Sequence, residues 1–316
     1  MTRSPPINLP PAGAPGSAWV DAIASAFDAA DLFFGHGTDN ARDEATWLVA
    51  GVAGLDYANA DWPIALERLL VDPLSERVRT DVATLARRRI SERIPLAYLL
   101  NQAWFCGRAY FVDERVLVPR SPIASLIDAR FSPWVNPEKI TRVLDLCTGS
   151  GCIGIATALA LPWARVDATD LSADALTVAR QNVQTHQVAN QVDLYQGDLF
   201  DALARDSRYD LIVTNPPYVD ASEMHARPAE FCAEPELGLA AGDDGLDIAR
   251  RILVDAARFL RPGGILVMEV GASDDALQAA FPTVPFTWWL SDDWGYGVLI
   301  MDREALVAHA QSLGAR

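Results

Sequence analysis

The sequence of 316 residues contains few cysteines and no long apolar run. Its four cysteines show no metal-ligand spacing, and a disulfide scaffold would be shorter and denser in cysteine, so we expect four reduced thiols and no metal site. Charged residues, Gly or Pro interrupt each apolar run well before the roughly 18 residues that a membrane helix needs, which excludes a membrane-spanning protein. The first residues lack the apolar segment of a secretory signal, so we expect the chain to remain in the cytoplasm.

Basic residues are scarce relative to acidic ones. Lys and Arg together number 26 against 42 Asp and Glu, which gives a formal net charge of -16. A protein that coats nucleic acid needs a surplus of positive charge on at least one face, so we expect no direct nucleic-acid substrate. An acidic surface instead favours association with basic proteins.

The N-terminal third divides into three segments. Residues 1–16 contain five prolines and almost nothing to bury, which predicts a disordered leader. Residues 17–95 carry apolar side chains at helical spacing, which predicts a small helical domain. Residues 96–120 are rich in aromatic and β-branched residues, and we interpret them as a hairpin linker with strands at 103–106 and 110–118.

The basic run and the histidines of the chain give no indication of a catalytic or binding site. The only basic run, residues 87–89, is interpreted as a solvent-exposed helix end without a functional role. The four histidines, among them His36, lie in no triad-like context, and we interpret them as surface or structural residues.

From residue 121 to the C-terminus the pattern is that of an α/β domain. Short apolar strands are predicted at 142–146, 165–169, 192–196, 209–214 and 264–270, with helical stretches between them. This alternation indicates a mostly parallel sheet with helices on both faces. Two further strands at 287–290 and 297–301, joined around residues 292–295, predict an antiparallel hairpin at the end of the sheet.

A glycine-rich loop follows the first strand of this domain. It contains the spacing G-x-G-x-x-G at Gly149, Gly151 and Gly154, and Asp170 ends the next strand sixteen residues after Gly154. A carboxylate at that position can accept hydrogen bonds from both hydroxyls of a ribose. These features fit a nicotinamide dehydrogenase nearly as well as a methyltransferase, because both bind an adenosyl ribose at this place in the fold.

Two further acidic residues favour the methyltransferase. Asp145 lies four residues before the first glycine, where it would repel a pyrophosphate but attract the sulfonium and ammonium groups of S-adenosylmethionine. Asp198 and Leu199 end the third strand and can hold the amino group and the ring of an adenine. Asp198 and Leu199 also fit an ordinary turn after a strand.

The strand 209–214 ends in Asn215-Pro216-Pro217-Tyr218. The two prolines remove two donors and keep the backbone extended. The Asn215 side-chain oxygen and the Pro216 carbonyl can both accept from one planar NH2 group, and Tyr218 can stack on it. An amide nitrogen is a poor nucleophile and no base is in reach, so we expect positioning of the NH2 group to replace deprotonation.

At these residues the sequence resembles the class I methyltransferases, and more narrowly the protein-glutamine N(5) methyltransferases of the translation machinery. Further stretches similar to that family occur at residues 92–99, 111–112, 118–120, 234–239 and 243–247. In enzymes that modify peptide-chain release factors, the Pro-Arg of this family is usually followed by Pro-x-Thr-Glu. Here Ser121-Pro122-Ile123-Ala124 follows it, and residues 99–107 look like the branch that modifies the third protein of the large ribosomal subunit.

The resemblance implies a seven-stranded, mostly parallel, Rossmann-like methyltransferase sheet over residues 121–316, preceded by a helical substrate-recognition domain. It implies that S-adenosylmethionine is the cofactor and that Asn215, Pro216, Pro217 and Tyr218 hold the substrate glutamine, with Asn215, Pro216 and Tyr218 as catalytic residues. The residues that it implies for the cofactor are Asp145, Cys147, Thr148, Gly149, Ser150, Gly151, Asp170, Leu171, Asp198, Leu199 and Asn215.

Four alternatives remain open from the sequence. The chain can be a release-factor methyltransferase, or an adenine N(6) methyltransferase that grips a flipped base through the same four residues. It can also be a module that binds the cofactor or assists ribosome assembly without catalysis. A nicotinamide dehydrogenase is the fourth alternative, through the spacing of its three glycines.

Overall fold

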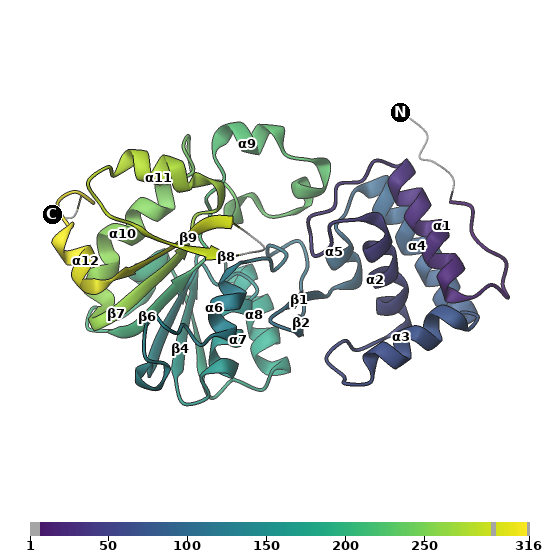
Figure 1. Cartoon of the computed structure of the whole chain (residues 1–316), viewed down its shortest axis with the longest axis horizontal. Helices are drawn as coiled ribbons and strands as arrows, with labels where there is room; N and C mark the ends of the chain where they lie inside the picture. Colours follow the sequence, from purple (N-terminus) through teal and green to yellow (C-terminus); the bar gives the residue numbers. More distant parts are fainter. Residues whose placement is uncertain (1–6, 292–294, 315–316) are drawn as a thin grey trace. The chain divides into compact units, whose positions relative to one another are not determined.

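The computed structural model describes residues 7–291 and 295–314 (Figure 1), and the chain divides into two compact units. Unit 1 contains the residues up to 114 together with 118–120 and 228–234, and unit 2 contains the rest. This division differs from the one expected from the sequence at two places. Most of the hairpin segment belongs to the helical unit, and residues 228–234, from the middle of the α/β region, belong to it as well.

Unit 1 is built mainly from helices. They are α1 (Gly16–Ala29), α2 (Ala41–Ala53), α3 (Trp62–Val71), α4 (Glu76–Glu92) and α5 (Leu96–Leu100). The side chains of Trp19, Ile23 and Phe27, which recur every four residues, are all buried, as the helical spacing predicts. Asn40 caps α2 by accepting a hydrogen bond from the backbone nitrogen of Asp43, and Ser75 caps α4 in the same way.

The predicted leader is wrong at its C-terminal end. Pro15 forms an isolated antiparallel bridge with Pro73, and α1 begins at Gly16. The backbone nitrogen of Gly16 donates a 3.0 Å hydrogen bond to the carbonyl of Asp72. A proline before a helix is already restricted to a favourable φ, so its presence does not argue for disorder here. Residues 1–6 of the predicted leader lie outside the described residues.

The hairpin of unit 1 is shorter than expected. Strands β1 (Ala103–Phe105) and β2 (Arg108–Tyr110) pair antiparallel across a two-residue turn in which Cys106 and Gly107 both have positive φ. This is the geometry of the tight turns that suit a twisted hairpin. The predicted continuation of the second strand to residue 118 is wrong, and the backbone nitrogen of Val118 donates instead to the Glu234 carboxylate at 3.0 Å.

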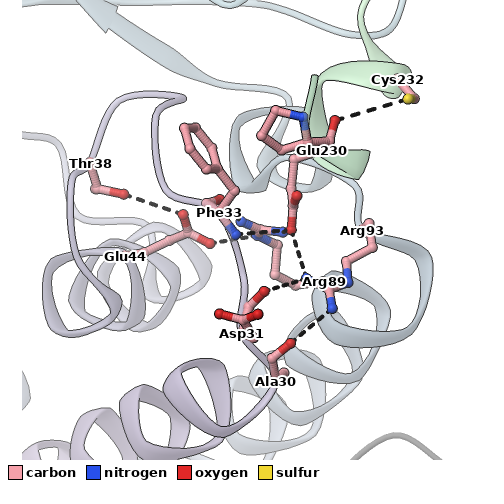
Figure 2. A network of polar contacts seen from close by, with 10 residues as sticks. Ala30, Asp31, Phe33, Thr38, Glu44, Arg89, Arg93, Glu230 and Cys232 are labelled. Carbon is pink, nitrogen blue, oxygen red and sulfur yellow. Dashed lines mark hydrogen bonds and ion pairs between the residues drawn. The ribbon is translucent and has the colours of Figure 1, made fainter. Parts of the chain in front are cut away.

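The prediction that the basic run at residues 87–89 is solvent-exposed is wrong for Arg89, which is completely buried. Its guanidinium donates to Oε1 of Glu44 at 2.6 Å and to the carbonyl of Phe33 at 2.8 Å. Glu230 lies 3.4 Å from the same guanidinium and 3.0 Å from that of Arg93. Figure 2 shows this network of polar contacts. Arg87 and Arg88, the other two residues of the basic run, are exposed as expected.

Unit 2 contains a seven-stranded sheet. Its strands are β3 (Arg142–Leu146), β4 (Arg165–Asp170), β5 (Val192–Gln196), β6 (Tyr209–Thr214), β7 (Leu260–Glu269), β8 (Thr287–Ser291) and β9 (Gly295–Asp302). Their order is β5-β4-β3-β6-β7-β9-β8. The first five strands are parallel, and β9 is antiparallel to both of its neighbours, β7 and β8. The fold class predicted from the sequence is therefore confirmed. Of the predicted connection at 292–295, residues 292–294 lie outside the described residues.

Helices connect the strands of unit 2 and cover the sheet. They are α6 (Ile123–Asp128), α7 (Cys152–Ala160), α8 (Ala173–Thr185), α9 (Ala221–Ala226), α10 (Asp247–Phe259), α11 (Asp274–Ala280) and α12 (Arg303–Ala308). Helix α7 packs with α6 and α8, and α10 packs with α12. The crossovers through α7 and α10 leave the centre of the sheet in opposite directions, so right-handed connections place them on opposite faces. Within the described residues, no helix is long and apolar enough to cross a membrane.

Candidate active site

The order of the strands reverses between β3 and β6, and ligands of open α/β sheets bind at such a point. Leu146, the last residue of β3, pairs with Thr214, the last residue of β6. The hydroxyl of Thr214 also donates a 2.9 Å hydrogen bond to the carbonyl of Leu146. The glycine-rich loop and the segment 215–218 therefore leave the sheet from adjacent positions at its carboxyl edge.

Asp145 fixes the shape of the glycine-rich loop. Its Oδ2 atom accepts hydrogen bonds from the backbone nitrogen of Gly154 at 2.9 Å and from the hydroxyl of Thr148 at 2.5 Å. A Cβ atom at position 154 would lie 2.8 Å from that oxygen, so glycine is required there. Burial raises the pKa of Asp145 to about 7 despite these hydrogen bonds. Its buried Oδ1 atom has no hydrogen-bond partner within the described part of the chain.

Asp170 holds the other side of the same loop. Its Oδ2 atom accepts a 2.8 Å hydrogen bond from the backbone nitrogen of Gly149, and its Oδ1 atom accepts one of the same length from Ser172. Burial raises the pKa of this carboxyl group as well. The side chain is only half-buried, so its remaining lone pairs face a region that a ligand can reach.

The side chains of the loop itself are unequally accessible. Thr148 and Ser150 are buried, whereas Cys147 and Gly149 are half-buried. A Cβ atom at Gly149 would meet no other atom within 4 Å, so there is open space beside this residue. Burial raises the pKa of Cys147, which keeps its thiol protonated at neutral pH.

These features fit S-adenosylmethionine. A buried carboxylate oxygen without a partner, on Asp145, and a second carboxylate, on Asp170, flank a loop that has open space beside it. Carboxylates suit the positive sulfonium and ammonium groups and the ribose hydroxyls of that molecule, whereas they would repel a pyrophosphate.

The residues expected at the adenine differ in their surroundings. Asp198 forms a 2.8 Å ion pair with Arg251, and both side chains are about half-exposed. Arg251 was not among the residues predicted from the sequence. Leu199 is buried and has a φ of 51°, at the start of a 3-10 turn (Leu199–Ala202). Leu171 is 51% exposed, so it offers an apolar surface next to Asp170.

Asn215 is half-buried and has an uncommitted side chain. Its amide group makes no hydrogen bond to any residue in the ranges that the structure describes. Pro216 beside it is buried, and Pro217 is half-buried. A stiff backbone thus carries an amide oxygen that remains able to accept a hydrogen bond from a ligand.

Tyr218 is held by residues that the sequence reasoning missed. Its hydroxyl donates to Oε1 of Glu269, and its backbone carbonyl accepts from the hydroxyl of Ser273, both at 3.0 Å. A Cβ atom at Gly271 would fall 2.4 Å from Cε2 of the ring, so the ring lies directly against the backbone there. The position of Glu269 at the end of a predicted apolar strand was the one signal in the sequence that could have identified it.

The comparisons with known proteins identify the family of the chain. The family model "Methyltransferase small domain" matches residues 133–233. A ribosomal protein uL3 glutamine methyltransferase of Francisella tularensis subsp. tularensis (strain SCHU S4) is 42% identical over 90% of this chain and 89% of its own. One of Neisseria gonorrhoeae (strain FA 1090) is 45% identical over 90% of this chain and 92% of its own. The chain belongs to this family of uL3 glutamine methyltransferases. Like these relatives, it is a methyltransferase. This result excludes the nicotinamide dehydrogenase that the spacing of the three glycines also allowed.

Proposed function

We propose that this enzyme transfers the methyl group of S-adenosylmethionine to the side-chain amide nitrogen of a glutamine in ribosomal protein uL3. Relatives that match nearly the whole chain carry this activity in their names. The observation that carries the proposal is the side-chain amide of Asn215, which makes no hydrogen bond within the described part of the chain. Asn215 directly follows Thr214, which pairs with Leu146, so it lies next to the start of the glycine-rich loop.

The glycine-rich loop and the acidic residues around it hold the cofactor in this proposal. S-adenosylmethionine supplies an electrophilic methyl group on a positively charged sulfur. The backbone of residues 147–151 and the carboxylate of Asp145 face its methionine portion, Asp170 accepts from the ribose, and Leu171, Asp198 and Leu199 surround the adenine.

The substrate amide is bound by acceptors and not by a base. The side-chain oxygen of Asn215 and the carbonyl oxygen of Pro216 accept from the NH2 group of the glutamine, while the ring of Tyr218 packs against its plane. Two acceptors orient the nitrogen and stabilise the positive charge that develops on it. The buried Glu269 holds the hydroxyl of Tyr218, so the ring is preorganised before the substrate arrives.

Unit 1 serves as the substrate-recognition unit in this proposal. The net charge of -16 favours association with a basic protein such as a ribosomal protein, and it disfavours a nucleic acid as the direct substrate. Newly made ribosomal protein is present in the cytoplasm, where we expect the enzyme to act.

The proposal is tested with labelled S-adenosylmethionine and three purified acceptors that lack the methyl group: uL3, a peptide-chain release factor and adenine-containing RNA. We expect label on one glutamine of uL3, identified by mass spectrometry. Label on the release factor or on adenine instead, or cofactor binding without any product, would overturn the proposal in favour of an alternative.

A pair of variants tests the role of Asn215. Asn215→Ala should fold and bind the cofactor but lose at least on the order of a hundredfold in turnover, the scale of removing one preorganised polar contact. Asn190→Ala, an exposed asparagine elsewhere in unit 2, is the matched control and should keep full turnover. Near-normal turnover by Asn215→Ala on uL3 would contradict the assigned role.

A further inference from the structure

Unit 1 contains a cavity with aromatic walls and a volume of about 460 Å³. Its walls include Trp47 from α2, Trp62 from α3, Trp104 from β1, and Tyr57 from the segment between α2 and α3. The volume falls within the range typical of sites for small ligands. None of these four residues takes part in the cofactor site or in the segment 215–218.

The aromatic rings stand at angles to one another. The ring centroid of Tyr57 lies 5.1 Å from that of Trp62 with an interplanar angle of 42°, and 5.1 Å from that of Trp104 with an angle of 72°. Because the planes are inclined and not stacked, the rings do not cover each other fully. Tyr57, Trp62 and Trp104 are each only half-buried, so the cavity communicates with the surface.

The charges at the cavity are acidic. Among the lining residues that belong to the described part of the chain, Asp43 is the only carboxylate, and none is a Lys or an Arg. Asp56 and Asp61 directly precede Tyr57 and Trp62 in the sequence, and all three Asp residues are exposed. Their field therefore favours a positively charged occupant over a neutral or an acidic one.

Aromatic faces attract a cation through their quadrupole, and an adjacent carboxylate adds to this attraction. The long apolar stem of a Lys or Arg side chain would pack on the same rings and carry its charge toward the acidic rim. We propose that this cavity binds a basic side chain, Arg or Lys, of the protein substrate. The identity of that substrate rests on the proposed function, whereas the preference for a cation rests on the cavity itself.

The first test measures binding without methyl transfer. The full chain is titrated with the peptides acetyl-Gly-X-Gly-amide, where X is Arg, Lys, citrulline or norleucine, and the indole N–H signals of Trp47 and Trp104 are followed by NMR. The Arg and Lys peptides should shift these signals with an affinity at least tenfold above that of the neutral peptides. Equal binding of norleucine would show an apolar docking site, and absence of saturable shifts would show no site; either outcome overturns the proposal.

The second test uses kinetics with uL3. Asp43→Asn and Tyr57→Ala should each raise KM for uL3 about 5- to 30-fold, while kcat and the affinity for S-adenosylmethionine stay unchanged. Tyr57→Phe keeps the aromatic face and should restore a KM near that of the unmodified enzyme. Glu76→Gln is the matched control for Asp43→Asn, because Glu76 is an exposed acid in the first turn of α4 and does not line the cavity.

The two tests separate this inference from the proposed function. If uL3 is not methylated but the Arg and Lys peptides still bind selectively, the proposed function fails and the cation site stands. If uL3 is methylated and the Asp43 and Tyr57 variants keep a normal KM, the cation site fails alone. A thermal unfolding curve for each variant establishes that it is folded before its KM is compared.

Discussion

The hydroxyl group of Tyr218 donates a 3.0 Å hydrogen bond to Oε1 of Glu269, which connects the end of the segment 215–218 to the end of β7. Oε2 of Glu269 accepts a 2.5 Å hydrogen bond from Ser121. The carboxylate is 4% exposed, so it depends on these donors in place of water. The orientation of the Tyr218 ring thus depends on Glu269, and on Ser121, which donates to the same carboxylate; both lie outside the segment 215–218.

Removing only the hydroxyl should therefore disturb both stability and activity. We expect Tyr218→Phe to lower the free energy of unfolding by about 1–3 kcal/mol, because a buried carboxylate loses a donor. Turnover should fall about tenfold or more, because the ring loses the contact that orients it. Tyr195→Phe is the control, since Tyr195 is 38% exposed on β5, and it should change neither quantity. Equal effects of the two variants would contradict the positioning role of Glu269.

The contact between Gly271 and the ring of Tyr218 leads to a second prediction. Gly271 and Gly263 both have positive φ, at 50° and 73°, so alanine should cost each of them about 1 kcal/mol in backbone strain. A Cβ atom at Gly263 meets no other atom within 4 Å, whereas one at Gly271 would fall 2.4 Å from the ring. We expect both variants to lose stability in urea unfolding and only Gly271→Ala to lose turnover, by tenfold or more.

A loss of turnover in Gly263→Ala as large as that in Gly271→Ala would show that strain, and not displacement of the Tyr218 ring, causes the effect. Cofactor affinity should be nearly equal in the two variants, because the ring is assigned to the substrate amide. Isothermal titration with S-adenosylmethionine checks this point.

The pKa of Asp145 predicts how stability changes with pH. Burial raises this pKa to about 7 from its ordinary value of 3.8, so between these values the folded chain holds a proton that the unfolded chain has released. The contribution of Asp145 to stability is therefore complete below about pH 4, falls as pH rises to about 7 and then levels off. Asparagine has no proton to release, so the stability of the unmodified enzyme relative to Asp145→Asn should decline across this window, by at most about 4 kcal/mol.

Urea unfolding of both proteins at pH 5, 6, 7 and 8 measures this difference. Asp193→Asn, at an exposed position on β5, is the control and should show no comparable trend. A difference between the unmodified enzyme and Asp145→Asn that stays constant from pH 5 to pH 8 would show that Asp145 is already ionised throughout.

The parts of the fold that could be predicted were those encoded by local pattern. The strands at 142–146, 192–196 and 209–214 have the predicted bounds. The first and the third lie in the centre of the sheet and are largely buried, and such strands are marked in the sequence by mostly apolar runs with clear turn residues after them. Which residues of the glycine-rich loop are buried and which are accessible could not be predicted. Whether Thr148 points inward depends on its hydrogen bond to Asp145, and such a bond has no signature in residue type alone.

Contacts between distant parts of the sequence account for the main errors. Arg89 lies in a basic run that is typical of an exposed helix end, yet its partners Glu44 and Glu230 are 45 and 141 residues away. A buried charge is tolerated only when it is paired, and its partners cannot be identified before the fold is known. The membership of residues 228–234 in unit 1 was missed for the same reason.

Glu234, in that segment, gives the last prediction. Burial alone would raise its pKa, but His36, whose Nε2 atom lies 3.6 Å from the carboxylate, and two hydrogen bonds from Arg120 outweigh burial. They lower the pKa to about 2 from its ordinary value of 4.5. The folded-state pKa is depressed, so the stabilisation from the ionised group is complete above about pH 4.5 and is lost as pH falls toward 2. At one pKa unit per about 1.4 kcal/mol, the stabilisation at neutral pH amounts to about 3 kcal/mol.

Glu234→Gln should therefore be less stable than the unmodified enzyme at pH 7, and the difference should shrink as pH is lowered from 5 to 3. Glu92→Gln is the control, because the ion pair of Glu92 with Arg88 is half-exposed and such pairs contribute less than about 1 kcal/mol. A deficit of Glu234→Gln that persists unchanged at pH 3 would mean that the glutamine disrupts packing, and that the charge of Glu234 is not what stabilises the segment 228–234.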